Sequence, residues 1–249
     1  MKTTGNTILI TGGGTGVGLE SAKLFSKAGN KVIMVARNKE RLESEAAKLE
    51  NATAIVCDLS IEEDMRNLVT RLKDDFKDLN MILLNAGLAN HYGLFETPDA
   101  FNYSKQEMIT NFHSAVFLTH ELEPLLAEKT DAAMLITTSG VALAPDLMHP
   151  TYSATKAALH SYTQGIRLAL ERKGSTIKVF EMMLPLVDTS FASAIKSDDK
   201  AQPQDVAAAI VDGLQKDIYE MHIGIVQKLY ETYLNSPHEA LLAINALTN

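Results

Sequence analysis

Short apolar runs alternate with longer amphipathic segments along the whole chain. Most of the apolar runs are continuous, as expected for strands that are covered on both faces. The predicted strands span residues 7–11, 31–36, 53–57, 81–85, 133–139, 177–184 and 220–226. The predicted helices span residues 16–28, 38–49, 61–76, 104–128, 151–172, 203–217 and 227–247, with a break at Pro237. This alternation predicts an α/β fold with a doubly wound parallel sheet, a Rossmann fold of about seven strands with helices on both faces.

One domain accounts for the whole chain. No internal repeat, low-complexity tract or linker rich in proline and serine divides the 249 residues, so we expect a single dinucleotide-binding domain, 1–249. Polar and helix-breaking residues fill 188–205, between a predicted strand and the next helix. Loops at the ligand-binding edge of such folds often close over ligands. We therefore expect this segment to be a flexible lid that is poorly ordered without ligand.

Charge and composition exclude several classes of partner. The net charge of −8 and the pI of about 5.4 argue against nucleic acid and anionic membranes. No apolar run approaches the roughly 20 residues that span a bilayer, and the first run is too short for a signal peptide. The single cysteine, Cys57, fits a reducing compartment, and the seven histidines show no metal-ligand spacing. We expect a soluble, cytoplasmic protein without a metal site.

The first strand runs directly into a glycine-rich turn, TGGGTGVG, followed by a helix. Thr11, Gly12, Gly16 and Gly18 fit the pattern T-G-x-x-x-G-x-G. Glycines let backbone N–H groups and the helix N-terminus approach a pyrophosphate closely. A purely steric turn is the alternative, but the flanking strand and helix favour nucleotide binding. The predicted cofactor-binding residues of this turn are Gly12, Gly14, Thr15, Gly16, Val17 and Gly18.

The end of the second strand bears on the choice of cofactor. NAD-binding folds usually place an acidic residue there to hold the ribose 2′-hydroxyl, whereas this chain has Ala36 and Arg37. An arginine suits a 2′-phosphate, because its donors and charge match the phosphate oxygens. The alternative is a solvated arginine that pairs with Glu40 or Glu43. We expect NADP(H) rather than NAD(H).

Two more strand ends supply candidate cofactor contacts. Asp58 and Leu59 follow the third strand, where the adenine is expected, although Asp58 could instead cap the following helix. Asn85, Ala86 and Gly87 lie at the carboxyl edge of the fourth strand, where small residues and a glycine let the backbone pass close to a cofactor.

Four polar residues fall near the carboxyl ends of the central strands, where open α/β sheets bind ligands. Ser139 ends the fifth strand, Tyr152 and Lys156 share one face of the next helix, and Asn111 lies in the preceding helix. An ammonium beside a phenol stabilises the phenolate, so Tyr152 could act as an acid/base. The Ser139 hydroxyl could bond a developing oxyanion. Asn111 could hold a water near Lys156, or simply bond neighbouring backbone.

The motifs together resemble the short-chain dehydrogenase/reductase family. The glycine turn, the NAG of 85–87, Asn111, Ser139 and the YSATK of 152–156 follow the family order and spacing over essentially the whole chain. The beginning MKTTGNTILITGG and the later SPHEALLAIN resemble reductases encoded with lipoteichoic-acid D-alanylation genes.

This resemblance implies roles for individual residues. Tyr152 would be the catalytic acid/base, Lys156 would lower its pKa and bond the nicotinamide ribose, and Ser139 would polarise the substrate carbonyl. Asn111 would maintain a proton-relay water. The further cofactor contacts that we expect are Tyr152, Lys156, Pro185, Val187 and Thr189. Family members commonly pair the helices near 104–126 and 151–172 across a two-fold axis, so a homodimer or homotetramer is expected.

The chain departs from the family pattern at two positions. Leu84 replaces an asparagine before Asn85, and Leu186 replaces a glycine after Pro185. Neither change removes a catalytic group, so both bear on the shape of the substrate pocket. His149, just before Pro150, either lines that pocket or faces solvent.

The sequence therefore predicts an NADP(H)-dependent oxidoreductase that reduces a ketone or aldehyde, or oxidises the corresponding alcohol. The alternative is an NADP(H)-binding regulator or sensor on the same fold, without significant turnover. The intact set of Ser139, Tyr152 and Lys156 favours the enzyme, because a pure sensor needs no proton donor. The expected partner is a small carbonyl or alcohol substrate.

Overall fold

The computed structural model describes residues 1–193, 195, 197 and 199–246. Seven strands form one sheet in the order β3-β2-β1-β4-β5-β6-β7, and all neighbouring strands are parallel. The strands are β1 (Thr7–Thr11), β2 (Lys31–Ala36), β3 (Ala52–Val56), β4 (Met81–Leu84), β5 (Ala133–Ser139), β6 (Lys178–Leu184) and β7 (Glu220–His222). The predicted doubly wound Rossmann-like fold is confirmed.

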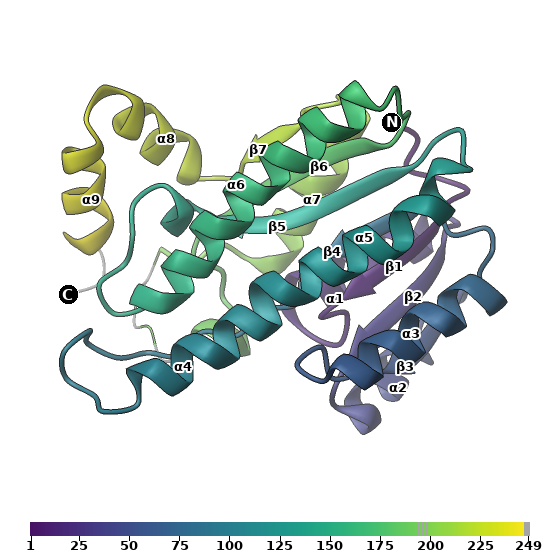
Figure 1. The fold of residues 1–249 in the computed structure, drawn as a ribbon, viewed down its shortest axis with the longest axis horizontal. Helices are drawn as coiled ribbons and strands as arrows, with labels where there is room; N and C mark the ends of the chain where they lie inside the picture. The colour runs from purple at the N-terminus through teal and green to yellow at the C-terminus, as the bar shows by residue number, and fades with distance from the viewer. Residues whose placement is uncertain (194, 196, 198, 247–249) are drawn as a thin grey trace.

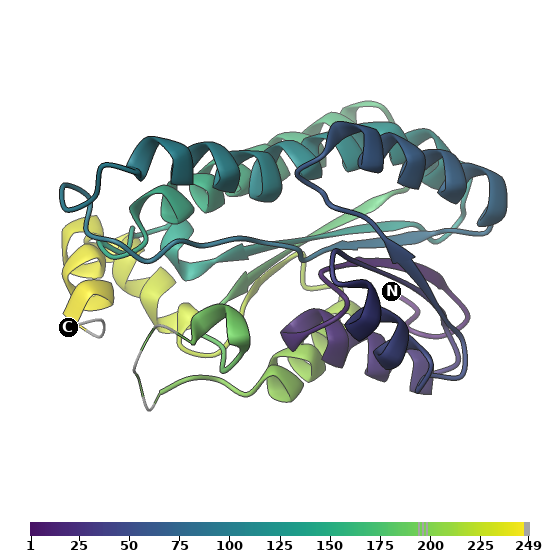
Figure 2. The ribbon, with the colours of Figure 1, turned by 90° about the horizontal axis from the view of Figure 1, so that it is seen from below.

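Helices cover both faces of the sheet, which makes three layers (Figures 1 and 2). The α-helices are α1 (Gly16–Lys27), α2 (Lys39–Ala46), α3 (Glu62–Asp75), α4 (Ala100–Glu107), α5 (Ser114–Ala127), α6 (Pro150–Arg172), α7 (Pro203–Gln215), α8 (Val226–Asn235) and α9 (Pro237–Ala246). Helices α3, α5 and α6 cover one face, and α1, α2 and α7 cover the other. Helices α8 and α9 lie outside these layers, beyond the carboxyl edge of the sheet.

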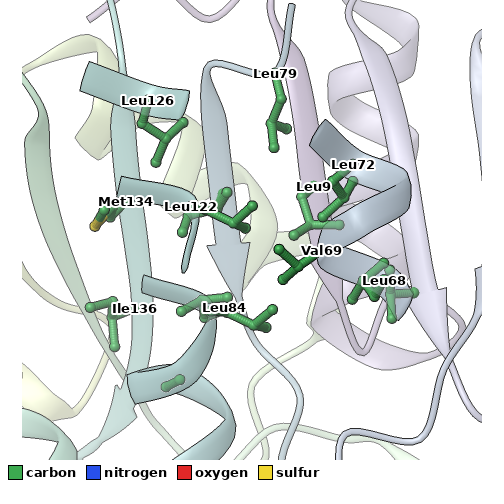
Figure 3. Packing of buried hydrophobic residues seen from close by; sticks show 14 of the residues in the cluster. Leu9, Leu68, Val69, Leu72, Leu79, Leu84, Leu122, Leu126, Met134 and Ile136 are labelled. Atoms are coloured by element: carbon green, nitrogen blue, oxygen red, sulfur yellow. The ribbon is translucent and has the colours of Figure 1, made fainter. Parts of the chain in front are cut away.

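Each face of the sheet buries its own apolar core. Leu9 points toward α3, whereas its neighbours Ile8 and Ile10 point toward α1, because successive side chains of a strand alternate between faces. Figure 3 shows the first core, in which leucines of α3 and α5 pack over β1, β4 and β5. Burying each such side chain contributes about 1.5–3 kcal/mol. Both faces are thus apolar, which explains the continuous apolar runs.

The long helix predicted over 104–128 differs from the structure in two respects. It begins earlier, at Ala100, where the exposed Phe101 gives no apolar periodicity to follow. It also contains a π-helical turn, Met108–His113, between α4 and α5. Such wide turns occur frequently at functional sites, and this one carries Asn111.

The last part of the chain also differs in detail. The strand predicted over 220–226 ends at His222, because Gly224 adopts a left-handed φ of 61° and turns the chain into α8. The predicted break at Pro237 separates α8 from α9, and residue 247 of the predicted last helix lies outside the described residues. No helix among the described residues has the length and apolarity needed to cross a membrane.

The chain on either side of the segment predicted to be a lid is held together by backbone pairing. Val187 and Ala201 form an isolated parallel bridge, and between them lies a short 3₁₀ helix, Ser190–Ala192. Residues 194, 196 and 198 of the predicted lid lie outside the described residues. Its flexibility stays a prediction.

Candidate active site

The sheet order creates a ligand-binding edge. Strand β1 pairs with β2 on one side and β4 on the other, so the chain winds in opposite directions from this point. Open α/β sheets bind ligands at the carboxyl ends of the strands at such a switch point. A cavity of about 950 Å³ opens there. The predicted site residues that line it are Gly12, Thr15, Gly16, Val17, Asn85, Ala86, Gly87, Ser139, Tyr152, Lys156, Pro185, Val187 and Thr189.

The glycine turn forms a close-packed cradle at this edge. Gly12 and Gly16 have left-handed φ values of 67° and 54°. A Cβ at Gly18 would overlap the carbonyl oxygen of Gly12, and one at Gly16 would lie 2.9 Å from Thr189. Helix α1 begins at Gly16, so its free N–H groups face the cavity. This bare turn at a helix N-terminus fits a dinucleotide pyrophosphate, whereas side chains would fill the same space.

A smaller hollow of about 230 Å³ adjoins the turn. The predicted residues Gly14, Arg37, Asp58 and Leu59 line it, together with Arg41 of α2. An Arg37 guanidinium nitrogen lies 4.0 Å from an Asp58 carboxylate oxygen, and the Arg37 side chain is exposed. The hollow therefore has two arginines that could bind a 2′-phosphate, of which sequence reasoning had identified only Arg37.

Asp58 makes local bonds that bear on its alternative role. Its carboxylate accepts from the N–H and the hydroxyl of Ser60, at 2.9 and 2.7 Å. The residue flanking the start of the next helix, α3, is Ile61 rather than Asp58. Asp58 thus stabilises the turn before the helix while lining the hollow.

The end of β4 is held against the glycine turn. The Thr11 hydroxyl accepts from the N–H groups of Asn85 and Ala86, at 3.0 and 3.1 Å. The Asn85 side chain donates to the Thr11 carbonyl at 3.3 Å. Three hydrogen bonds therefore join the two strand ends. Leu84, which departs from the family pattern, is buried in the core of Figure 3.

Asn111 joins the loop after β4 to α6. Its Oδ1 accepts from the Leu88 N–H at 2.7 Å, and its Nδ2 donates to the Leu88 carbonyl and the Thr155 hydroxyl, at 2.8 and 2.9 Å. The alternative that Asn111 simply bonds neighbouring helix backbone is wrong for the side chain, which bridges two distant segments. A water held near Lys156 stays a prediction.

Ser139, Tyr152 and Lys156 lie on one side of the large cavity. Ser139 ends β5, and its hydroxyl donates to the Leu184 carbonyl at 3.2 Å. Tyr152 lies in the first turn of α6, with the Lys156 nitrogen 5.6 Å from its ring centroid. The Lys156 ammonium donates to the Thr137 carbonyl at 2.7 Å. The spacing of four on one helix thus places phenol and ammonium together, as predicted.

Burial shifts the acidity of both groups. It raises the pKa of Tyr152; the Ser139 hydroxyl lowers this pKa by hydrogen bonding, and the Glu107 carboxylate raises it further. Burial also lowers the pKa of Lys156 to about 8, against the opposing effect of the Glu181 carboxylate. The phenol therefore stays protonated at neutral pH and can donate a proton. The neighbouring ammonium can stabilise the phenolate that this leaves.

Glu107 is a buried acid that sequence reasoning missed. Its carboxylate accepts from the backbone and side chain of Asn90, at 2.7 and 3.0 Å, and from the Thr151 hydroxyl at 2.5 Å. These bonds tie the end of α4 to the start of α6, next to Tyr152. The hydrophobic pattern gave no signal for it, because a glutamate in a helix is usually solvated.

His149 lines the cavity and is buried, which decides between its two predicted positions. Its Nδ1 lies 2.7 Å from a carboxylate oxygen of Asp146, and its Nε2 lies 3.3 Å from Nδ1 of His91. Both ring nitrogens therefore have partners in the protein. Leu186, the second departure from the family pattern, also lines the cavity.

Helices α8 and α9 form the far wall of the cavity. Val226 and Leu229 of α8 and Ile244 of α9 line it. Leu229 and Val226 also pack over Gly140, where any Cβ would lie 3.0 Å from Leu229. Sequence reasoning had not assigned these residues to the site, because amphipathic helices usually bury their apolar face in a core.

Comparison with known protein families matches residues 6–200 to the short chain dehydrogenase family. The chain belongs to this family. The dehydrogenase is 35% identical over 200 residues to an uncharacterised oxidoreductase, DltE, of Bacillus subtilis, covering 80% of this chain and 78% of that protein. The predicted family is confirmed. The match to DltE also confirms the narrower resemblance, to the subgroup of reductases encoded with lipoteichoic-acid D-alanylation genes.

Solved structures support the same fold for this dehydrogenase. A short chain dehydrogenase from Burkholderia cenocepacia in complex with NADP matches with a TM-score of 0.85 at 22% identity, covering 98% of each chain. A short chain dehydrogenase/reductase from Burkholderia phymatum in complex with NAD has the same TM-score at 17% identity, covering 100% of this chain and 98% of that one. At these identities the likeness concerns the fold alone.

Proposed function

We propose that this dehydrogenase uses NADP(H) to reduce a ketone or aldehyde, or to oxidise the corresponding alcohol, with Tyr152 as the acid/base. The observation that carries the proposal is that Ser139, Tyr152 and Lys156 line the same cavity as the glycine turn. A proton donor, an oxyanion partner and a cation thus face a dinucleotide cradle across one space.

When bound, the nicotinamide cofactor supplies or accepts a hydride at the carbonyl carbon. In reduction, the Tyr152 hydroxyl donates its proton to the oxygen that gains negative charge. The Ser139 hydroxyl, once turned away from the Leu184 carbonyl, donates a hydrogen bond to the same oxygen and holds it near the phenol. Lys156 stabilises the phenolate that remains, and in oxidation this phenolate takes the proton back.

The preference for NADP(H) rests on the smaller hollow. Arg37 and Arg41 line it together, and both are exposed toward solvent. Two guanidinium groups compensate the double charge of a 2′-phosphate, whereas a ribose 2′-hydroxyl needs only a single acceptor. One relative in fold was solved with NADP and another with NAD, so the family fold accommodates both.

The substrate side of the cavity favours a carbonyl compound with an apolar substituent. Leu186, Val226, Leu229 and Ile244 extend the lining from the reactive groups to α8 and α9. Both nitrogens of His149 are engaged with other side chains, which leaves its ring as a wall rather than an anion-binding group. We also propose a cytoplasmic location, which the single buried free thiol of Cys57 supports.

The test is a panel of ketones and aldehydes followed by NADPH absorbance, with the wild type and Tyr152→Phe. We expect turnover that favours apolar carbonyls, and a loss of about 10²- to 10⁴-fold in kcat in the variant. NADPH binding, measured by fluorescence, should be nearly unchanged. Tight NADPH binding with no turnover on any substrate would instead support the sensor.

A further inference from the structure

A buried carboxylate lies near the proposed catalytic pair, in the strand next to the edge strand β7. Glu181 is in β6, within the apolar run IKVFEMML, and its side chain has no exposure to solvent. It is not among the residues that line the cavity, and the mechanism above gives it no direct part. An ionised carboxylate in such a place is costly unless partners compensate it.

Two hydrogen-bond partners hold Glu181. The Thr138 hydroxyl of the neighbouring strand donates to Oε1 at 2.6 Å. Nδ1 of His160 lies 2.9 and 3.0 Å from the two carboxylate oxygens, and this bond raises the pKa of His160. The carboxylate is thus fixed between β5 and α6.

The partners of Glu181 are adjacent to those of Lys156. His160 lies four residues after Lys156 on α6, one turn further along the same face. Thr138, which donates to Glu181, follows Thr137, whose carbonyl accepts from Lys156. The groups that hold the two buried charges are therefore neighbours along both β5 and α6.

Other charged groups surround this pair from each packed element. From β7, Glu220 is opposite Glu181 in the strand register, and it is paired with His222 at 3.0 Å. From α6, the Arg167 guanidinium donates to the Val179 and Tyr219 carbonyls, at 3.3 and 3.1 Å. On the far side of Lys156 lies Tyr152, which the Glu107 carboxylate influences. Of the carboxylates named here, Glu181 is the one whose charge acts on Lys156.

We infer that Glu181 is a positioning residue for the proposed reaction: its buried carboxylate keeps the Lys156 ammonium protonated beside Tyr152, and His160 regulates this effect. The inference rests on the proposed function. When His160 is neutral, the Glu181 charge is uncompensated and favours the ammonium. When His160 is protonated at lower pH, the ion pair is neutral overall and the effect on Lys156 weakens.

The negative charge of Glu181 determines the direction in which the pH profile of carbonyl reduction should shift. Burial raises the pKa of Tyr152 and lowers that of Lys156 to about 8, so Lys156 loses its proton first as the pH rises. Removing a nearby negative charge makes that loss easier. Reduction needs the protonated pair, so its rate should fall at a lower pH when Glu181 is neutralised.

The experiment compares pH profiles of kcat/KM for carbonyl reduction in the wild type and Glu181→Gln. The amide keeps acceptors for Thr138 and removes the charge. The alkaline midpoint is the pH at which kcat/KM has fallen to half of its maximum on the alkaline side. We expect this midpoint to be about one pH unit lower in Glu181→Gln. An unchanged midpoint in an active Glu181→Gln variant would overturn the inference.

Three further variants serve as controls. Glu220→Gln makes the same charge change one strand away and should leave the midpoint nearly unchanged. An equal shift in Glu220→Gln would mean that the net charge of the region, rather than the position of Glu181, is responsible. His160→Gln keeps a donor for Glu181 without a charge, so its alkaline midpoint should match the wild type. His160→Arg compensates Glu181 at every pH and should lower the midpoint, which tests the inference even when Glu181→Gln does not fold.

A spectroscopic titration separates this inference from the proposed function. The NMR signal of the Lys156 side chain in each protein labelled with ¹³C-lysine, obtained as the difference from its Lys156→Met counterpart, reports the ionisation of Lys156 without turnover. We expect Glu181→Gln to change the titration curve of this signal. If the wild type reduces no carbonyl, the proposed function fails while the titration curves still test the influence of Glu181. If the wild type is active and the curves coincide, the inference fails.

Discussion

Arg37 and Arg41 line the hollow beside the glycine turn, and both side chains are exposed, with the Arg37 guanidinium 4.0 Å from the Asp58 carboxylate. We predict that Arg37→Ala raises the KM for NADPH about tenfold or more, because it removes a charge-assisted hydrogen bond. The KM for NADH should change little. Steady-state kinetics with both cofactors measures this.

Lys39→Ala is the matched control for that prediction. Lys39 lies on α2 near both arginines, but its nitrogen lies 4.0 Å from a Glu43 oxygen and it does not line the hollow. The variant makes the same change of charge and should leave the ratio of the two KM values unchanged. An equal loss in both variants would indicate general electrostatic attraction.

At the scale of single residues, the sequence predicted the groups whose chemistry lies within a motif. Tyr152, Lys156 and Ser139 could be assigned because their spacing fits one reaction. Glu107 could not be assigned, because a lone glutamate in a helix does not indicate whether it is buried. For Glu181 a signal was present in the sequence, but it was not used. The informative signal for Glu181 was an acid inside a continuous apolar run, a combination that needs a partner from elsewhere in the fold.

At the scale of elements, the glycine turn depends on the close approach of its own backbone. We predict that Gly18→Ala destabilises the protein by about 1–3 kcal/mol and abolishes NADPH binding, because its Cβ would overlap the Gly12 carbonyl. Urea unfolding and cofactor fluorescence measure the two effects.

Gly165→Ala is the matching control in a helix. Among the described residues, nothing beyond its chain neighbours and its own helix backbone lies within 4 Å of a Cβ at Gly165, which is exposed and lies in the interior of α6. Alanine there should stabilise the protein by about 0.5–1 kcal/mol, since glycine is the weaker helix former. A loss of stability at Gly165 as large as that at Gly18 would contradict the steric argument.

The segment 188–205 leads to a prediction about ligand protection. Its base is held by the Asp188 N–H to Ala201 carbonyl bond at 2.9 Å, and Phe191 packs on Tyr152 with ring centroids 5.7 Å apart. We predict that NADPH slows hydrogen exchange and proteolysis of this segment, because its described residues Phe191, Ala192 and Ile195 line the cavity. Equal protection with and without NADPH would contradict a lid.

Element positions were predictable to within a few residues at most boundaries, because continuous apolar runs and helical periodicity come from burial on two faces. The π turn at Met108–His113 was not, since its sequence is compatible with an ordinary helix. The same limit applies to α8 and α9. Their amphipathic pattern indicates an apolar face but not that this face lines a cavity.

At the scale of the whole molecule, α5 and α6 lie next to each other on the outer side of the sheet (Figure 1). We predict that they pair with those of a second copy, giving a dimer or tetramer in light scattering. Leu168 of α6 is half exposed, at 49%, so Leu168→Glu should weaken this association. Leu24→Glu, on the opposite face in α1, should not. A wild-type monomer at micromolar concentration would refute the prediction.

The anchoring of α9 explains how the cavity wall holds its place. The Asn245 side chain donates to the Pro145 carbonyl at 3.0 Å and accepts from the Leu147 N–H at 2.8 Å. The wall is therefore attached to the loop before α6, the helix that carries Tyr152. Sequence alone gave the sheet and its reactive edge, whereas this long-range contact depends on the folded chain.

The position of α8 and α9 has a consequence for how such enzymes diversify. The family match ends at residue 200, whereas the wall lies after residue 222 and outside the three layers. Exposed positions of this wall can change without disturbing either the sheet or the proton donor, provided that Val226 and Leu229 stay packed over Gly140 and Asn245 keeps its bonds to the loop before α6. Under the proposed function, part of the substrate wall is thereby encoded apart from the reactive residues, so we expect that exchanging the final stretch between relatives changes the substrate preference.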